Sequence, residues 1–570
     1  MSIVRRKYIQ HHKFIENVVY PLILFFYPLV MIFQGLDLSD STYSLANYMY
    51  FSRMEGMWVI STYVSNVFGF LLTLLPGGAT LIGMKLYTGL CLSGLVLLSY
   101  FGLRRHLSPV SVFAGEIIAV GLCWIPTTIL YNYLTYFFFA LGLILLYEGI
   151  IRENKWYYFW AGVSLGLNVM VRVPNVTEAI LIIGLWYAMW LKKETFQKTM
   201  QATGICLAGY VAGLAVPLAA VHIQYGKTAL TDMITGLSGV AGSDDTYTPW
   251  SMISSVIHAY SRSFMWVAIV MMGILMGILL FAIKKEKYLF IKKMIYFAGI
   301  ALVLRFFWGR GMFSFRYYED YTSMFEWGML GLYLSLAISL YVMVGKYFRI
   351  QEKVMAMLVF LVILVTPLGS NNYTCQNLNN LFVVAPFTVY MYRLVFKSRK
   401  HILLYPLKSF VTVIAMMILI QSVGFHFNFV FRDGMDGADR YYRLKGTLAA
   451  NGIYTTLENA NAFRTLSDFC LENDYEGAEA ICYGNIPGLH FMLRMPFALT
   501  NAWPDLDSYG FAQMQDELQK KEEPVPVVIL SKQETTSEQM EEKKELLLQY
   551  INENGYENVF ENERYCVYRY

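Results

Sequence analysis

Charged residues are scarce in this chain of 570 residues: Asp, Glu, Lys and Arg make up 15 % and hydrophobic residues 56 %. Soluble globular proteins average about 25 % charged residues, so a chain with a mean hydropathy of +0.43 is typical of a polytopic membrane protein. The seven cysteines include no CxxC pair, the eight histidines are scattered, and neither GxSxG nor HExxH occurs. The segment "YGKT" at 225–228 lacks the first glycine of a phosphate-binding loop. These absences give no support to a metal centre, a serine hydrolase or a P-loop enzyme.

Long apolar runs are abundant instead. A transmembrane helix needs about 20 apolar residues, and candidate spans begin near Val18, Leu81, Val110, Tyr133, Trp156, Val176, Thr203, Phe264, Met294, Phe325, Val354, Leu381 and Leu403. The first follows a basic segment and lacks a small-residue cleavage site, so we expect a retained helix. The segment "RVPN" interrupts the fifth and sixth spans, which predicts broken helices that line a cavity.

Basic clusters fall in every second loop between these spans, from Arg5–Lys7 to Lys397–Lys400. The positive-inside rule then predicts a cytoplasmic N-terminus, and about 13 transmembrane helices place the C-terminus outside. We expect the protein to lie in the plasma membrane. We expect a transmembrane domain over 1–426 and an extracytoplasmic domain over 427–570. Basic residues are in excess in the membrane part, so we assign that charge to its loops and expect no nucleic-acid partner.

The C-terminal part is acidic and reads as a small α/β domain. The segments "LENANAFRTLSDFCLEND" and "SEQMEEKKELLLQYINENG" predict helices, the second ending at Gly555. "AEAICYG" and "VPVVILS" predict strands, and "YENVFENERYCVYRY" predicts a terminal strand or hairpin. A disulfide among Cys470, Cys482 and Cys566 is compatible with an external domain. The aromatic segment "NAWPDLDSYGF" fits either core packing or a platform for carbohydrate.

Two aspartates, Asp37 and Asp40, stand where the chain leaves the first apolar run. Ser39 or Asp40 is suited to cap the helix "STYSLANYMYF" that follows. A carboxylate at the edge of a membrane cavity is equally suited to act as a general base or a metal ligand. The two interpretations are compatible.

Several arginines lie on the predicted outer side, where the positive-inside rule predicts few basic residues. A guanidinium is costly in lipid and binds phosphate bidentately, so we expect these side chains to face a cavity. The alternative is pairing with a nearby acid, such as Arg316 with Glu319 or Asp320, whereas Arg172 has only Glu178 close in sequence. The arginines concerned are Arg53, Arg172, Arg262, Arg305, Arg310 and Arg316.

Two further polar segments lie in predicted external loops. Asp244 and Asp245 fit a solvated loop, or a lid that contacts an acceptor. The segment "PLGSNNYTCQNLNN" is rich in amides, which form turns or hydrogen-bond a sugar. Its asparagines are Asn371, Asn372, Asn377, Asn379 and Asn380.

Taken together, the motif Asp40-Ser41-Thr42-Tyr43, the segments "LYNYLTYFFFALGLILLYEG" and "SLGLNVMVRVPN", and the external C-terminal part resemble the GT-C glycosyltransferases. That class includes protein O-mannosyltransferases, lipid A aminoarabinose transferases and oligosaccharyltransferase catalytic subunits. Its members take a sugar from a polyprenyl-phosphate or polyprenyl-diphosphate carrier, mostly with inversion. The essential acid lies in the first external loop, with an aromatic residue three or four positions on.

The resemblance implies roles for particular residues. Asp40 would be the general base, Asp37 would orient the acceptor or a cation, and Arg172 would hold the departing phosphate. Further substrate contacts would come from Arg305, Arg310, Arg316, Tyr43, Asn371 and Asn372. The chain departs from the mannosyltransferase pattern because Ser41, not Glu, follows Asp40. It also lacks an acidic pair in "WIPTTILYN", where oligosaccharyltransferases keep a metal motif, so no cofactor is certain and a divalent cation stays a possibility.

Other classes of function share much of this pattern. A lipid-linked saccharide flippase or transporter also has many helices, broken spans and arginines in a cavity, although repeat symmetry is lacking here. A non-catalytic protein of envelope assembly that binds lipid or polymer is a third possibility. For the transferase, the partners are a polyprenyl-phosphate-sugar donor, an extracytoplasmic acceptor and the lipid bilayer.

Overall fold

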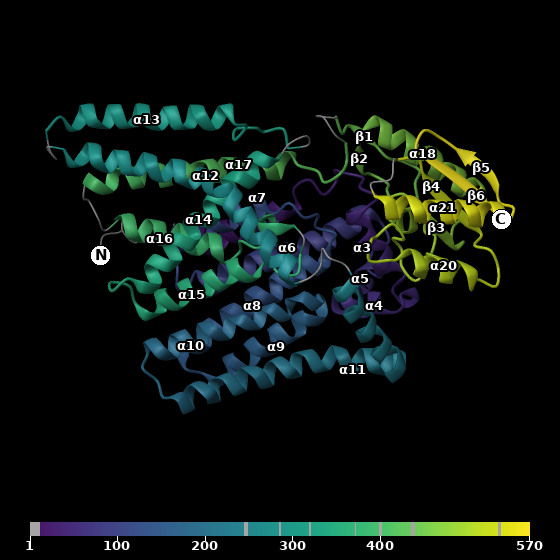
Figure 1. Ribbon diagram of the computed structural model, residues 1–570, viewed down its shortest axis with the longest axis horizontal. Coiled ribbons are helices and arrows are strands. Elements are labelled where there is room, and N and C mark those ends of the chain that lie inside the picture. The colour runs from purple at the N-terminus through teal and green to yellow at the C-terminus, as the bar shows by residue number, and fades with distance from the viewer. Residues whose placement is uncertain are drawn as a thin grey trace.

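The computed structural model describes residues 12–243, 249–283, 287–317, 321–370, 372–397, 402–434, 439–533 and 537–570. A helical bundle forms most of the elongated molecule, and a small domain with a sheet lies at one end (Figure 1). The polytopic helical fold with a small C-terminal α/β domain, predicted from the sequence, is confirmed.

Helices account for most of the described residues up to Asn428. In chain order they are η1 (Ile15–Val19), α2 (Tyr20–Phe26), η2 (Tyr27–Leu29), α3 (Asp40–Met49), η3 (Phe51–Arg53), α4 (Met57–Ser61), α5 (Tyr63–Thr73), α6 (Leu81–Leu103), α7 (Pro109–Leu122), α8 (Leu130–Arg152), α9 (Lys155–Val171), η4 (Val173–Leu181), α10 (Ile182–Leu191), α11 (Phe196–Ser243), α12 (Pro249–Ala282), α13 (Leu289–Gly309), α14 (Thr322–Val344), α15 (Ile350–Val365), η5 (Tyr373–Asn379), α16 (Val384–Lys397), η6 (Ile402–Leu404) and α17 (Tyr405–Asn428).

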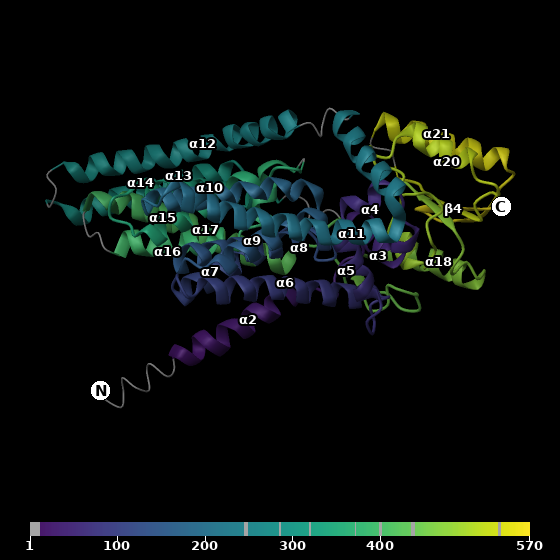
Figure 2. The same ribbon diagram turned by 90° about the horizontal axis from the view of Figure 1, so that it is seen from below.

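A helix lies at or next to each predicted span. In the described residues, seven helices are long and apolar enough to cross a membrane, and three shorter ones are apolar. The first predicted span is irregular: it begins as a π-helix, continues as α2 and ends as a 3-10 turn. Pro21 and Pro28 each lack a backbone N–H and interrupt the regular hydrogen bonding there. Figure 2 shows α2 projecting from the bundle below α6.

The predicted break between the fifth and sixth spans is present. Helix α9 ends at Val171, Arg172 is extended (φ −158°, ψ 122°), and η4 follows as a 3-10 helix. Pro174 in the first turn of η4 offers no N–H donor. It packs against Gly369, where the chain has a φ of +84° and a Cβ would come 2.2 Å from the Pro174 ring.

Helices α9 and α11 cross closely through two pairs of glycines, a feature that was not predicted from the sequence. Gly162 and Gly166 lie on α9, and Gly209 and Gly213 on α11, each pair spaced by four residues. A Cβ on any of the four would come within about 2.2 Å of a carbonyl oxygen on the other helix. Small residues at this spacing let two membrane helices pack backbone to backbone.

The C-terminal domain contains the predicted elements. Its four-stranded sheet has the order β3-β4-β6-β5, in which β3 and β4 are parallel and the other pairs antiparallel. The two predicted helices are α18 and α21, and the terminal segment is a hairpin. All seven cysteines are described and are free thiols. The domain consists of β1 (Tyr442–Arg443), β2 (Tyr454–Thr455), α18 (Leu457–Glu472), β3 (Ala480–Tyr483), α19 (Leu489–Met492), α20 (Phe511–Gln519), β4 (Val527–Ser531), α21 (Glu538–Glu553), β5 (Glu557–Glu561) and β6 (Tyr565–Arg569).

This domain packs directly on the segment that follows the first helix. The backbone N–H of Gly488 donates to the carbonyl of Leu38 at 2.8 Å. A Cβ at Gly488 would overlap the side chain of Thr42, at 1.8 Å from its Oγ1. One hydrophobic core joins the two parts, with Leu45 of α3 and Leu489 of α19 both fully buried in it. The start of α3 is therefore held between the bundle and the C-terminal domain.

Candidate functional site

Asp37 is the side chain that caps α3. Its Oδ1 accepts from the backbone N–H of Ser39 at 2.9 Å and from the Ser39 hydroxyl at 2.6 Å, and its Oδ2 accepts from the N–H of Ser41 at 2.9 Å. Ser39 occupies the N-cap position, as the sequence suggested, but its own side chain makes no cap bond. Asp37 is buried, and the N–H groups at the start of the helix use both of its oxygens.

Asp40 faces outward from the first turn of α3. Its Oδ2 lies 2.6 Å from Nη1 of Arg432, and about a third of its side chain (35 %) is exposed. Burial raises the pKa of Asp40, Arg432 opposes this shift, and Asp37 adds to it. Arg432 also donates to the hydroxyl of Ser39 at 3.1 Å. The Asp40 carboxylate is thus held by one partner in a partly desolvated place.

A cavity of about 140 Å³ opens beside these residues. Its wall comes from the end of the first helix, α6, the loop after α7, and the end of α17 with the segment behind it. Asp37, Ser41 and Thr42 line it from the start of α3. The rest of the wall is largely apolar and aromatic, and includes Leu92, Val120, Trp124, Tyr133, Phe425, Phe429 and Phe431.

Lys85 is the cation in the wall of this cavity. Its Nζ donates to the carbonyls of Gln34 at 2.5 Å and Gly35 at 2.8 Å. The negative charges of Asp433 and Asp37 both interact electrostatically with its ammonium group. Two bonds leave one of the three ammonium protons for another acceptor.

Asp433 is a buried carboxylate near Lys85 and is held by hydrogen bonds of its own. It is fully buried and accepts from Thr455 and Asn459 at 2.6 Å each, and its Oδ2 lies 3.5 Å from Nε of the buried Arg440. Arg432 and Asp433 lie a few residues after the end of α17 at Asn428, far along the chain from Asp40. Lys85, Arg432 and Asp433 were not predicted from the sequence as site residues. A lysine inside the apolar run "LIGMKLYTGL" was the one available signal, because such residues are costly in a membrane.

Arg172 lies elsewhere in the described structure. Its Nη2 donates to the carbonyl of Gly369 at 2.5 Å, and its guanidinium lies 5.8 Å from the centre of the Tyr131 ring. Its charge also acts on buried Glu178, the acid close to it in sequence. Arg172 therefore braces the broken helix and does not line the cavity beside Asp37.

Tyr43 connects α3 to the C-terminal domain. Its hydroxyl donates to Oδ1 of Asn501 at 3.1 Å, and its ring meets that of Trp503 edge-on at 5.3 Å between centroids. Burial raises the pKa of Tyr43 to about 12. The aromatic segment 501–511 thus packs on α3, and Trp503 is largely buried there.

The other predicted arginines lie on exposed surface. Arg305 and Arg310 are on or just after α13, with Arg310 over the ring of Phe306, and Arg316 follows in the next loop. In the described residues none of the three lines the cavity. Glu319 and Asp320 lie outside the described residues. Two arginines have acidic neighbours. Arg53 forms an ion pair with Glu479, and the positive charge of Arg262 interacts electrostatically with Glu326.

Most amides of the segment 371–380 face inward. Asn379 accepts from the backbone N–H of Trp124 at 2.9 Å, Gln376 donates to the hydroxyl of Tyr136 at 2.8 Å, and Asn380 donates to Thr366 at 3.2 Å. These contacts tie η5 to the loop that lines the cavity. Asn372 is exposed, while Asn371, Asp244 and Asp245 lie outside the described residues.

The carboxylates do not form a cation site. Donor N–H and O–H groups occupy both oxygens of Asp37, and Arg432 pairs with Asp40. Within the described ranges no group of three or more His, Cys, Asp and Glu side chains could hold a metal ion. The donor set on these two residues therefore does not fit a divalent cation, and we derive no step through one.

Comparisons with known proteins give one likeness to report. No family model matches the chain, and no curated protein matches it. Among solved structures, it is similar to the crystal structure of the Archaeoglobus fulgidus oligosaccharyltransferase in complex with Zn and sulfate. The identity is 11 %, the TM-score is 0.43, and the match covers 90 % of this chain and 68 % of that chain.

Proposed function

We propose that this protein is a membrane glycosyltransferase that moves a sugar from a polyprenyl-phosphate-linked donor to an extracytoplasmic acceptor, with inversion. One observation carries the proposal. Asp40 presents a part-exposed carboxylate beside Arg432, and its neighbours Asp37 and Ser41 line a cavity whose wall is largely apolar and includes Lys85. A carboxylate suits an acceptor hydroxyl, a cation suits a departing phosphate, and an apolar wall suits an isoprenoid chain.

The chemistry needs one base and little acid catalysis. The acceptor oxygen forms a bond to the anomeric carbon, the bond from that carbon to the phosphate oxygen breaks, and its electron pair leaves with the phosphate. Asp40 takes the proton of the acceptor hydroxyl. The raised pKa of Asp40 makes it a better proton acceptor than a fully solvated aspartate. Asp37 holds the start of α3 in place and so orients Asp40.

The departing phosphate is best placed against Arg432 and Lys85. Arg432 carries a part-exposed guanidinium next to Asp40, and Lys85 has a proton to donate from the cavity wall. Both cations would stabilise the charge that develops on the phosphate. Arg172, Arg305, Arg310, Arg316, Tyr43, Asn371 and Asn372 stay predicted substrate contacts. Of those that the structure describes, none lines the cavity beside Asp37. In this proposal the C-terminal domain is extracytoplasmic and the N-terminus cytoplasmic, in the plasma membrane.

Release of sugar from a lipid carrier tests the proposal. Purified protein in detergent is supplied with a panel of radiolabelled polyprenyl-phosphate hexoses, and the sugar released from the lipid is counted. We compare wild type with Asp40→Asn and with Glu55→Gln, an exposed acid in the same segment. Release by wild type and Glu55→Gln, but not by Asp40→Asn, is the expected result. Equal release by Asp40→Asn would refute the role of Asp40.

A transporter would behave differently in the same experiment. The broken helix at Arg172 favours such a protein. Tight binding of the donors by wild type and Asp40→Asn alike, with no sugar released from any of them, would overturn the transferase and favour the transporter.

A further inference from the structure

A second, smaller cavity lies between the α8–α9 turn and the α10–α11 turn, and we call it the interface cavity. Its volume is about 60 Å³. The inner wall is apolar, formed by Tyr158, Met189, Ala202 and Ile205. The rim is charged and carries Glu153, Lys155, Lys192, Glu194 and Lys198. A cavity with an apolar inner wall and a charged rim suits an amphipathic ligand.

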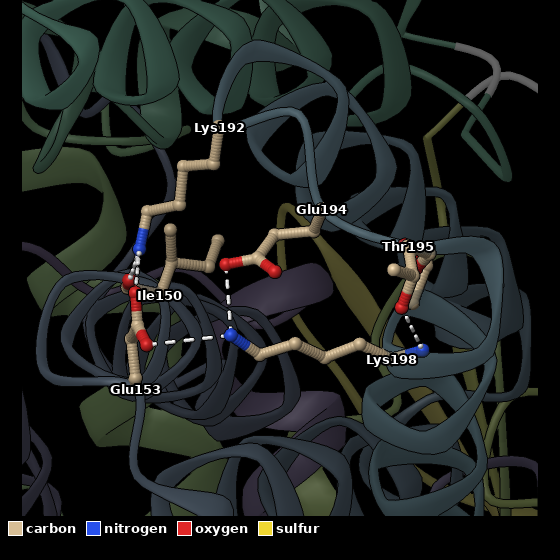
Figure 3. A network of polar contacts seen from close by, with 7 residues as sticks. Ile150, Glu153, Lys192, Glu194, Thr195 and Lys198 are labelled. Carbon is tan, nitrogen blue, oxygen red and sulfur yellow. Dashed lines mark hydrogen bonds and ion pairs between the residues drawn. The ribbon is translucent and has the colours of Figure 1, made fainter.

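Two of the three rim lysines share their carboxylates. Lys192 donates to Glu153 at 2.9 Å and to the carbonyl of Ile150 at 2.7 Å. Lys198 lies 3.5 Å from Glu153 and 2.8 Å from Glu194. Figure 3 shows the Lys198 ammonium between these two carboxylates. The hydrogen bond from Lys192 lowers the pKa of Glu153, which is therefore ionised at neutral pH.

The third lysine, Lys155, gives the rim a net positive charge. Lys155 is exposed and has no ion pair or hydrogen bond in the described structure. The rim thus carries three positive and two negative charges, with one cation left over. An anion that enters the cavity meets Lys155 at once, and it competes with Glu153 for the ammonium groups of Lys192 and Lys198.

Exposed aromatic side chains stand next to every one of these lysines. Trp156 (69 % exposed) follows Lys155, Trp190 (72 %) comes two residues before Lys192, and Phe196 (78 %) comes two residues before Lys198. Exposed tryptophan is typical of the level where lipid headgroups meet the hydrocarbon. Exposed aromatic residues beside these lysines fit a rim at the level of the lipid headgroups.

We propose that the interface cavity binds the headgroup phosphate of an anionic phospholipid, with Lys155, Lys192 and Lys198 as its cations. The phosphate oxygens accept from the three ammonium groups. The glycerol end of the acyl chains lies against the apolar inner wall. This site is separate from the Asp40 cavity, and it does not depend on the proposed transferase activity.

Retention of phosphatidylglycerol by the full-length protein tests the proposal. Delipidated protein in detergent is titrated with phosphatidylglycerol, and the lipid bound per protein is measured by native mass spectrometry. Phosphatidylcholine and inorganic phosphate serve as the other two ligands. We expect bound phosphatidylglycerol at concentrations where phosphatidylcholine does not bind. Equal binding of both lipids, or prevention of lipid binding by equimolar inorganic phosphate, would overturn the proposal.

Two matched lysines separate this site from general surface charge. Lys155→Gln removes a rim lysine that holds no other part of the fold, and Lys193→Gln removes an exposed lysine beside Lys192 that does not line the cavity. We expect Lys155→Gln to weaken phosphatidylglycerol binding about five-fold, the usual contribution of one lysine near a charged membrane, and Lys193→Gln to leave it unchanged. The same loss in both variants, or in neither, would contradict the proposal.

A third variant checks the competition within the rim. Glu153→Gln frees Lys192 and Lys198 from their shared carboxylate. Phosphatidylglycerol should then bind more tightly than to wild type. Weaker binding to this variant, measured below its unfolding temperature, would show that the phosphate does not take the place of Glu153.

Discussion

The Asp40 cavity and the interface cavity both place lysines and carboxylates around an apolar wall, but they hold their charges differently. Around Asp40, backbone and buried groups fix the charges: Asp37 binds helix N–H groups, and Lys85 binds two carbonyls. Around the interface cavity, Glu153, Lys192, Glu194 and Lys198 pair mainly through their side chains near the surface. Charges held by buried groups suit a reaction that needs defined geometry, whereas surface pairs can exchange partners when a ligand binds.

Replacement of Asp40 by asparagine should have the largest effect of all. A general base is worth about 10²–10⁴ in rate, so sugar release by Asp40→Asn should fall by that factor. Because burial raises the pKa of Asp40, the wild-type rate should be lost as the pH falls through this raised value, at higher pH than for a solvated aspartate. The residual rate of Asp40→Asn should not fall in this way at low pH. If it does, the loss of activity at low pH belongs to another titrating group.

Asp433→Ala should destabilise the corner that holds Lys85. The change leaves the buried guanidinium of Arg440 without its carboxylate, and breaking a buried pair costs about 3–5 kcal/mol. Unfolding of the purified protein in denaturant measures the loss. Asp516→Ala, in an exposed pair with Lys520, is the control and should change stability little. Similar losses in the two variants would mean that Asp433 is not the buried anchor described here.

Asp37→Ala should cost less stability, about 0.5–2 kcal/mol, the usual range for a lost helix cap. It should also lower sugar release, since α3 carries Asp40. Asp37→Asn, which keeps one acceptor oxygen, should recover part of both losses. Full activity in Asp37→Ala, with the stability loss alone, would separate the cap from the proposed reaction.

Glu194→Gln in the interface cavity should have the smallest effect. Glu194 forms a surface ion pair with Lys198, one turn along α11, and such pairs contribute little and are screened by salt. The unfolding midpoint should move less than in Asp37→Ala, and the difference should vanish in high salt. A large shift that persists in salt would show that the second region is as rigidly built as the first.

Much of the fold was predictable because its elements follow local patterns. The apolar runs marked a helix at each predicted span, and "RVPN" marked the break at Arg172. Short runs rich in Val, Ile, Tyr and Phe marked β3, β4 and the final hairpin. The irregular first helix, the glycine pairs of α9 and α11, and the number of helices long enough to cross a membrane were not evident from those patterns. These features depend on how the helices pack against one another in the tertiary structure.

The candidate site was predictable only in part. The position of Asp37 and Asp40 at the end of the first run was visible, as was capping at this point. Which carboxylate caps and which faces outward was not visible, because both stand within four residues of the same helix start. The amides of 371–380 show another limit of local patterns. The sequence suggested turns or sugar contacts, and in the described residues Asn379 and Gln376 are buried with hydrogen bonds to Trp124 and Tyr136.

The sequence by itself determined that this is a helical membrane protein with an acidic α/β domain at its C-terminal end, because hydropathy and periodicity are local properties of the chain. It also determined that two carboxylates stand at the edge of the first span. Only the tertiary structure decided which cations meet them. Arg432 reaches Asp40, and Lys85 reaches the segment before it, through contacts between residues far apart in the chain, and no local pattern encodes such contacts.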